Sequence, residues 1–170
     1  RTQFVHAIDL VPTVLEMLGI QAPTEIDGHT QKPIEGTSFR YNLDHSDAEE
    51  RHLTQYYEMM GCRAIYHRGW KAVTWHRKAV PVAGMESIPF DDDVWELYHV
   101  AEDFSEYEDL AEKYPEKLRQ LQDLWWAEAG RYNVLPLDDR AMGRMFEPRP
   151  KPYEDKSEYI YYPNGAQIGE

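Results

Sequence analysis

Cysteine is nearly absent from this chain, since Cys62 is the single one among 170 residues. One cysteine excludes an internal disulfide framework and any metal site built from several cysteines. Cys62 falls at the edge of a predicted strand, where we expect a small packing residue. We do not expect a catalytic thiol, because no neighbouring group that would activate it can be named. Such sparse cysteine fits a reducing compartment.

The chain also lacks long apolar runs. No stretch approaches the roughly 20 residues that a membrane helix needs, and no signal-peptide pattern is present. We therefore expect no membrane insertion. The first residue is Arg1 rather than methionine, so we expect a fragment of a longer protein.

Positive charge is scarce as well. Eighteen Lys and Arg residues stand against 31 Asp and Glu, which gives a net charge of −13 and a pI of about 4.9. Repulsion between like charges argues against nucleic acid and against anionic membrane surfaces as partners. A core is still within reach, because 42% of the residues are hydrophobic. The length suits one domain with attached segments.

The pattern of what is present predicts two helices. Apolar residues recur at spacings of three and four over residues 4–18, with Gly19 as a C-terminal cap. Pro12 suits a helix that begins near Asp9, because the missing N–H costs little in the first turn. The second helix should run from Pro115 to about residue 129, with Gly130 as its stop. Its apolar stripe consists of Leu118, Leu121, Leu124 and Trp125.

Four strands are expected between these helices, and residues 20–50 are expected to be mostly loop. Arg68-Gly69 should form a tight hairpin, with the glycine at positive φ. The fold class that follows is α+β, a small antiparallel four-stranded sheet packed under a C-terminal helix. The predicted strands span residues 53–60, 63–66, 70–76 and 94–100.

The C-terminal part of the chain changes in composition. Residues 138–156 are rich in proline and lack apolar periodicity, so they should form a linker. Residues 157–163, SEYIYYP, are typical of a single strand, and a strand without a partner is not stable alone. We therefore expect residues 157–170 to begin a further β-rich domain.

Four stretches carry a family resemblance: HAIDLVPTVLEMLGI, KPIEGTSF, GWKAVTWH and WELYHVAEDFSEYEDLA. In this order and at these spacings, over residues 4–140, the chain resembles the C-terminal portion of the sulfatases, bacterial arylsulfatases in particular. The resemblance implies the C-terminal subdomain of an alkaline-phosphatase-like fold. It implies that residues 1–44 end the catalytic domain and that residues 45–137 form the sheet-plus-helix subdomain. A bacterial cytoplasmic or periplasmic location would follow, with neither favoured.

The resemblance also implies what lies elsewhere. Sulfatases attack sulfur with a formylglycine, made from Cys or Ser in a C/S-x-P-S/A-R motif, beside a Ca²⁺ or Mg²⁺ ion. Cys62 has no proline two positions on, so it is not that precursor. We expect no cofactor in this chain and expect formylglycine and metal in a preceding part. No catalytic residue and no metal ligand can be carried over to a position here.

Candidate site residues are therefore few. His76, Arg77 and Lys78 border the long 77–93 connection and are the candidates for the mouth of a substrate site, since basic side chains attract an anionic ester. The alternative for His76 is an exposed loop histidine. Asp91, Asp92 and Asp93 could bind a divalent cation, but a solvated acidic loop explains them better. Most of the tryptophans should pack in the core rather than stack on sugars.

The function that the sequence predicts is the structural and substrate-mouth portion of an arylsulfatase, inactive without the catalytic part. The expected partner is the rest of the catalytic domain, and the apolar first helix makes self-association possible in its absence. Two alternatives stay open. One is the same portion of a related phosphatase or phosphonate hydrolase, and the other is a stand-alone binding module.

Overall fold

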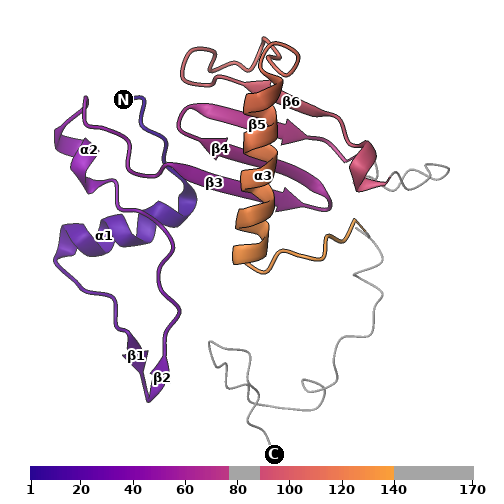
Figure 1. The fold of residues 1–170 in the computed structure, drawn as a ribbon. Coiled ribbons are helices and arrows are strands. Elements are labelled where there is room, and N and C mark those ends of the chain that lie inside the picture. The colour runs from indigo at the N-terminus through magenta and orange to yellow at the C-terminus, as the bar shows by residue number, and fades with distance from the viewer. Residues whose placement is uncertain (77–88, 140–170) are drawn as a thin grey trace, which may run out of the picture. The chain divides into compact units, whose positions relative to one another are not determined.

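The computed structural model describes residues 1–76 and 89–139. The described chain divides after His52 into two compact units (Figure 1). Within these residues, no helix combines the length and the apolar character needed to cross a membrane. Most of the predicted linker, the predicted strand at 157–163, and both Arg77 and Lys78 lie outside the described residues.

The first unit is built around helix α1 (Leu10–Leu18), which follows a short 3-10 turn, η1 (Ala7–Asp9). Pro12 occupies the first turn of α1, where the missing N–H leaves no α-helical hydrogen bond unmade. Gly19 ends the helix at φ 65°, and its N–H donates to Glu16 O. The predicted start near Asp9 and the predicted cap are confirmed, while residues 4–6 are not helical.

Residues 20–50 hold three short elements that the sequence did not predict. β1 (Glu25–Ile26) and β2 (His29–Thr30) form a minimal hairpin around Asp27-Gly28, whose φ angles are 50° and 80°. Asp-Gly is a strong signal for this tight turn, but strands of two residues carry no alternation to detect. α2 (Arg40–Asp44) is a single turn, closed by an ion pair between its first and last residues.

The second unit contains the predicted four-stranded sheet, in the order β3-β4-β5-β6 with every pair antiparallel. Met60-Gly61 and Arg68-Gly69 connect the first three strands, and all four residues have positive φ. Two consecutive residues at positive φ match the twist of the strands that they join. The strands are β3 (Thr54–Met59), β4 (Cys62–His67), β5 (Trp70–Thr74) and β6 (Trp95–Tyr98).

Helix α3 (Pro115–Arg131) lies across one face of this sheet (Figure 1). The sheet and helix together confirm the predicted α+β fold class. The predicted stop at Gly130 is wrong, because the helix continues to Arg131 and the N–H of Tyr132 still donates to Glu128 O. Ala129 is fully buried in the core, so packing of the last turn outweighs the roughly 1 kcal/mol that glycine costs in a helix.

The core lies between the sheet and α3. Trp125 is fully buried at its centre, and its Nε1–H donates to Tyr57 O at 3.0 Å. Trp70 and Trp95 pack against this core, as predicted, whereas Trp75 is 67% exposed. The buried apolar residues are Ile65, Ala72, Leu97, Leu121, Trp125 and Ala129.

Candidate functional site

The N-terminal stretch IDLVPT forms an internal structural anchor, called the clip below, rather than a reactive site. Asp9 is fully buried, and its carboxylate accepts the backbone N–H groups of His6 and Thr37, each at 2.7 Å. His52 Nδ1 lies 2.7 Å from Asp9 Oδ2 and 2.9 Å from Oδ1. A buried carboxylate with this many donors is a structural anchor, and it ties three distant stretches of the first unit together.

Thr13, the second polar residue of this stretch, makes further hydrogen bonds one helical turn after Asp9. Thr13 Oγ1 donates to Asp9 O at 2.6 Å and accepts the N–H of Phe39 at 3.0 Å. Gly36 lies so close to the start of α1 that an added Cβ would come within 2.1 Å of Ile8 O. The glycine of GTSF is therefore required by close backbone approach, and the segment 36–39 is held on α1 by Asp9 and Thr13.

The acidic stretch AEDFSEYEDLA is likewise engaged in holding backbone. Asp103 accepts the N–H groups of Tyr107 and Glu108 at 2.6 and 2.9 Å, and these bonds lower the pKa of its carboxyl. Asp109 Oδ1 accepts the N–H of Leu97 at 2.9 Å, which fixes the turn to β6. These carboxylates satisfy turn amides, which is a structural role.

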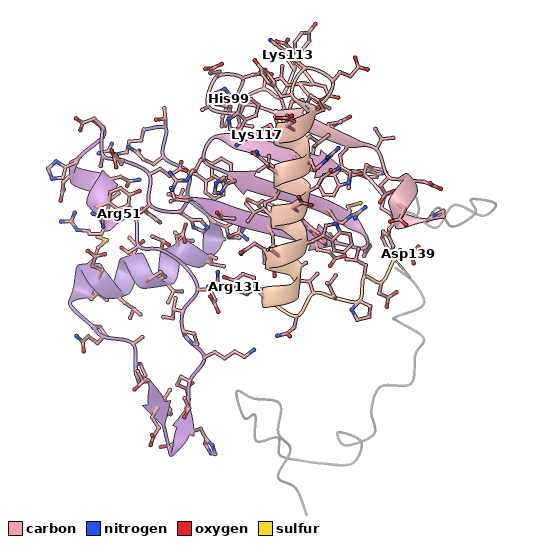
Figure 2. The ribbon with its side chains drawn as sticks, in the orientation of Figure 1. Arg51, His99, Lys113, Lys117, Arg131 and Asp139 are labelled. Carbon is pink, nitrogen blue, oxygen red and sulfur yellow. The ribbon has the colours of Figure 1, made fainter. Side chains whose placement is uncertain are left out.

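A third group of contacts lies around Trp70, the first tryptophan of GWKAVTWH. His99 stacks on Trp70 with centroids 4.3 Å apart, and Lys117 Nζ lies 5.7 Å from the same ring. Figure 2 labels His99 and Lys117 near the N-terminal end of α3. The neighbouring Lys71 Nζ pairs with both oxygens of Glu106, at 2.7 and 2.8 Å. The Trp70 ring is thus packed within the protein and offers no platform to a sugar.

His76, the main candidate from the sequence, is fully buried. Its Nδ1 lies 2.9 Å from both oxygens of Asp93, and its Nε2 lies 3.4 Å from Asp139 Oδ2. The expectation of an exposed loop histidine is therefore wrong, and its ring does not open to solvent. The alternation of β5 continues to His76, which could have indicated an inward side chain; the partner Asp139 lies 63 residues away and carries no sequence signal.

The triple aspartate divides between two roles. Asp91 and Asp92 are exposed, as a solvated acidic loop predicts. Asp93 instead has a side chain only 2% exposed and pairs with Arg63 Nη2 at 2.5 Å, so for this residue the prediction is wrong. Within residues 1–76 and 89–139, no group of three or more His, Cys, Asp or Glu side chains has an arrangement that could hold a metal ion.

The hydroxyl of Tyr98, at the end of β6, has a pKa well above the ordinary value of a tyrosine. Burial, together with the hydrogen bond that its hydroxyl donates to Glu96 Oε2 at 2.9 Å, raises its pKa to about 12. Because the folded pKa lies above the ordinary value of 10.0, the stabilising contribution is complete below pH 10 and is lost as the pH rises to about 12.

We therefore expect Tyr98 to ionise later than an ordinary tyrosine. The difference between the ultraviolet phenolate titrations of wild type and Tyr98→Phe should show one tyrosine with a midpoint near 12. The substitution keeps the ring and removes only the hydroxyl. The fold should therefore stay intact, and the difference between the two titrations belongs to Tyr98 alone. A difference curve centred at the ordinary value of 10.0 would contradict this assignment.

Comparisons with known proteins bear on the family. No protein-family model matches the chain. An uncharacterized sulfatase of Schizosaccharomyces pombe (strain 972) is 26% identical over 139 residues, covering 81% of this chain and 23% of the yeast protein. This match confirms the resemblance to sulfatases that the sequence motifs predicted, and the arylsulfatase type stays a prediction.

Two solved structures are similar at lower levels. One, from glycosaminoglycan metabolism in Bacteroides thetaiotaomicron, has 20% identity and a TM-score of 0.46, covering 70% of this chain and 24% of that one. The other was solved in complex with its substrate D-glucosamine-2-N,6-O-disulfate, with 19% identity, a TM-score of 0.48, and coverage of 78% and 25%. The chain thus spans about a quarter of the length of the proteins that it matches.

Proposed function

We propose that this chain is the C-terminal part of a sulfuric ester hydrolase of the arylsulfatase type, and that it supplies structure and part of the substrate mouth rather than the catalytic centre. The similarity to a sulfatase over 81% of the chain supports the family. The role within the enzyme is supported by one observation above all. In the matching stretches, the carboxylates of Asp9, Asp103 and Asp109 hold backbone amides of this same chain.

A supporting role also follows from the chemistry that sulfate ester hydrolysis needs. The reaction requires a nucleophile, stabilisation of negative charge on the sulfate, and an acid for the leaving group. Two basic residues of the sheet are engaged within the chain itself, with Arg63 paired to Asp93 and Lys71 paired to Glu106. We propose that the formylglycine, and the Ca²⁺ or Mg²⁺ ion, belong to another part of the intact enzyme.

The exposed apolar side chains of the first unit support its packing against another domain. Its buried residues are polar, namely Asp9, Thr13, Asn42 and His52, and none of its large apolar side chains is among the buried core. We propose that the catalytic domain covers this apolar surface, since exposed patches of this extent mark interfaces. In the isolated chain, self-association would cover this surface in place of the catalytic domain. The exposed apolar residues are Val5, Ile8, Leu10, Val11, Val14, Met17, Leu18, Ile20, Ile26, Ile34 and Leu43.

The proposal predicts a contrast in activity between the intact protein and the chain. The intact protein that carries this sequence should hydrolyse p-nitrophenyl sulfate with Ca²⁺ or Mg²⁺ present, and the chain of 170 residues should not. The physical reason is that the chain lacks an assembled nucleophile and anion site among its described residues. The measurement is release of p-nitrophenolate, with p-nitrophenyl phosphate as the matched substrate.

The possible outcomes distinguish the sulfatase proposal from its two alternatives. Faster turnover of the phosphate ester by the intact protein would replace the sulfatase by the phosphatase alternative. Metal-dependent turnover by the isolated chain, free of contaminating enzyme, would overturn the division of roles. An intact protein that is no longer than this chain and inactive on both esters would favour the stand-alone binding module.

A further inference from the structure

Four ionisable side chains from four separate stretches of the second unit meet at one end of the sheet, and the proposed function gives them no role. They are Arg63 on β4, His76 after β5, Asp93 before β6 and Asp139 after α3, which we call the buried charge cluster. Figure 2 labels Asp139 beyond the C-terminal end of α3. The side chains of the first three are at most 2% exposed, and that of Asp139 is 14% exposed.

Asp93 connects the members of this cluster. Its Oδ2 lies 2.5 Å from Arg63 Nη2, and both of its oxygens lie 2.9 Å from His76 Nδ1. The other ring nitrogen of His76 lies 3.4 Å from Asp139 Oδ2, so the imidazole stands between two carboxylates. The guanidinium of Arg63 and the imidazole of His76 therefore alternate with two carboxylates, so that each nitrogen group has a carboxylate as its neighbour.

Packing leaves the cluster no room to shift. The His76 ring stacks on Phe90 with centroids 4.3 Å apart and planes 22° apart. The carbonyl of Phe90 also accepts a hydrogen bond from Arg63 Nη2 at 3.2 Å. A Cβ added to Gly61 would come within 2.8 Å of both rings, so the β3–β4 turn packs directly against His76 and Phe90. The guanidinium of Arg63 lies over the rings of Phe90, Trp95, Trp125 and Trp126.

The use of charge at this position calls for a reason besides stability. A buried ion pair is often no more stabilising than well-packed apolar residues of the same size, because desolvation offsets the attraction. What charges and hydrogen bonds add is a single permitted geometry, since any displacement leaves a buried charge without its partner. The geometry specified here is the separation between His76, where the chain leaves β5, and Phe90–Asp93, where it returns to β6.

We propose that the buried charge cluster is a positioning device for the substrate mouth, and that His76 acts as a positioning residue rather than a substrate contact. The inference rests on the proposed function, which gives this chain part of the substrate mouth, and on the expectation from the sequence that His76 borders it. Because the imidazole is fully buried, it does not meet a substrate. It holds both ends of this connection at fixed places on the sheet, and Asp139 fastens the chain after α3 to the same point.

The anchoring step is tested on the chain itself by hydrogen exchange. In His76→Leu, backbone amides of residues 90–93 should exchange at least about tenfold faster than in wild type, because about 1.4 kcal/mol of lost local stability gives that factor. Amides of the β3–β4 hairpin should keep their rates. His76→Asn places an amide donor near Asp93, so it should recover most of the protection. Unchanged exchange at residues 90–93 in His76→Leu would overturn the anchoring role.

The positioning step is tested on the intact protein with p-nitrophenyl sulfate. His76→Leu should raise KM roughly tenfold with kcat changed less than about threefold, since misplaced binding groups weaken ground state and transition state alike. His76→Asn should restore KM. Leu121→Ala is the matched control, because this core residue is 1% exposed and its truncation destabilises the same unit without touching the cluster.

The outcomes of the two tests are separable. If Leu121→Ala raises KM as much as His76→Leu does, the effect is general destabilisation and the positioning role is overturned. If kcat falls tenfold with KM unchanged, His76 acts on the reaction itself and the inference is again overturned. If the intact wild type hydrolyses no sulfate ester, the proposed function fails, and the exchange result alone decides whether the cluster anchors residues 90–93.

Discussion

Trp125→Ala is expected to unfold the second unit at physiological temperature or to bring it close to unfolding. The indole is fully buried between α3 and the sheet, and its Nε1–H satisfies the carbonyl of Tyr57. Truncating a buried tryptophan costs about 3–5 kcal/mol. The lost hydrogen bond to a strand carbonyl adds to this cost. The sum is a large share of the roughly 5–15 kcal/mol by which a domain is stable.

The adjacent residue provides a matched control. Trp126 is 41% exposed and packs edge-on against Trp125, with ring centroids 5.0 Å apart. Trp126→Ala should therefore cost well under half as much as Trp125→Ala. Chemical denaturation followed by circular dichroism measures both variants. Equal destabilisation by the two substitutions would show that the core is not centred where the structure puts it.

Asp9→Ala should unfold the first unit while the sheet of the second unit stays folded. The substitution removes the acceptor of two backbone N–H groups and of the His52 ring nitrogen, all in a fully buried position. Removing one partner of a buried, hydrogen-bonded charge costs about 3–5 kcal/mol. Residues 1–52, the described part of the first unit, contribute no side chain to a buried apolar core that could offset this loss. Hydrogen exchange should show loss of protection in residues 37–52 and none in β3 to β6.

Asp9→Asn is the control for this effect. Asparagine keeps the size of the side chain and one carbonyl oxygen that can accept a backbone N–H. It should therefore retain part of the protection that alanine loses. Equal loss of protection in both variants would mean that the negative charge, rather than the geometry of the acceptors, holds the clip. Protection that is unchanged in Asp9→Ala would remove the clip as an account of this motif.

Much of the fold could be predicted because its signals are local. Alternating aromatic and β-branched residues marked the strands, and Arg68-Gly69 marked a turn that two positive φ angles confirm. Leu121 and Trp125 lie on the apolar stripe of α3 as the spacing predicted. The early stop expected at Gly130 is an error at an element end, where packing decides over propensity.

The roles of individual polar residues could not be predicted in the same way. His76 meets Asp139 across 63 positions and Asp9 meets His52 across 43, and no local pattern indicates either pair. Adjacency in the sequence predicts one role for Asp91, Asp92 and Asp93. The structure separates them, since an extended backbone at Asp93 turns only this side chain inward to Arg63.

The spatial order of the four strands, which equals their order along the chain, has a consequence for how the protein folds. Each strand pairs with the one that precedes it, so the loops to be closed are short apart from that between β5 and β6. Contacts that are near in sequence lower the entropy lost before the first favourable contact forms, which speeds folding. The β3–β4–β5 meander is therefore the natural folding nucleus, onto which β6 and α3 dock afterwards. A ribosome that had released the chain only as far as residue 76 would already have exposed all three strands of this meander.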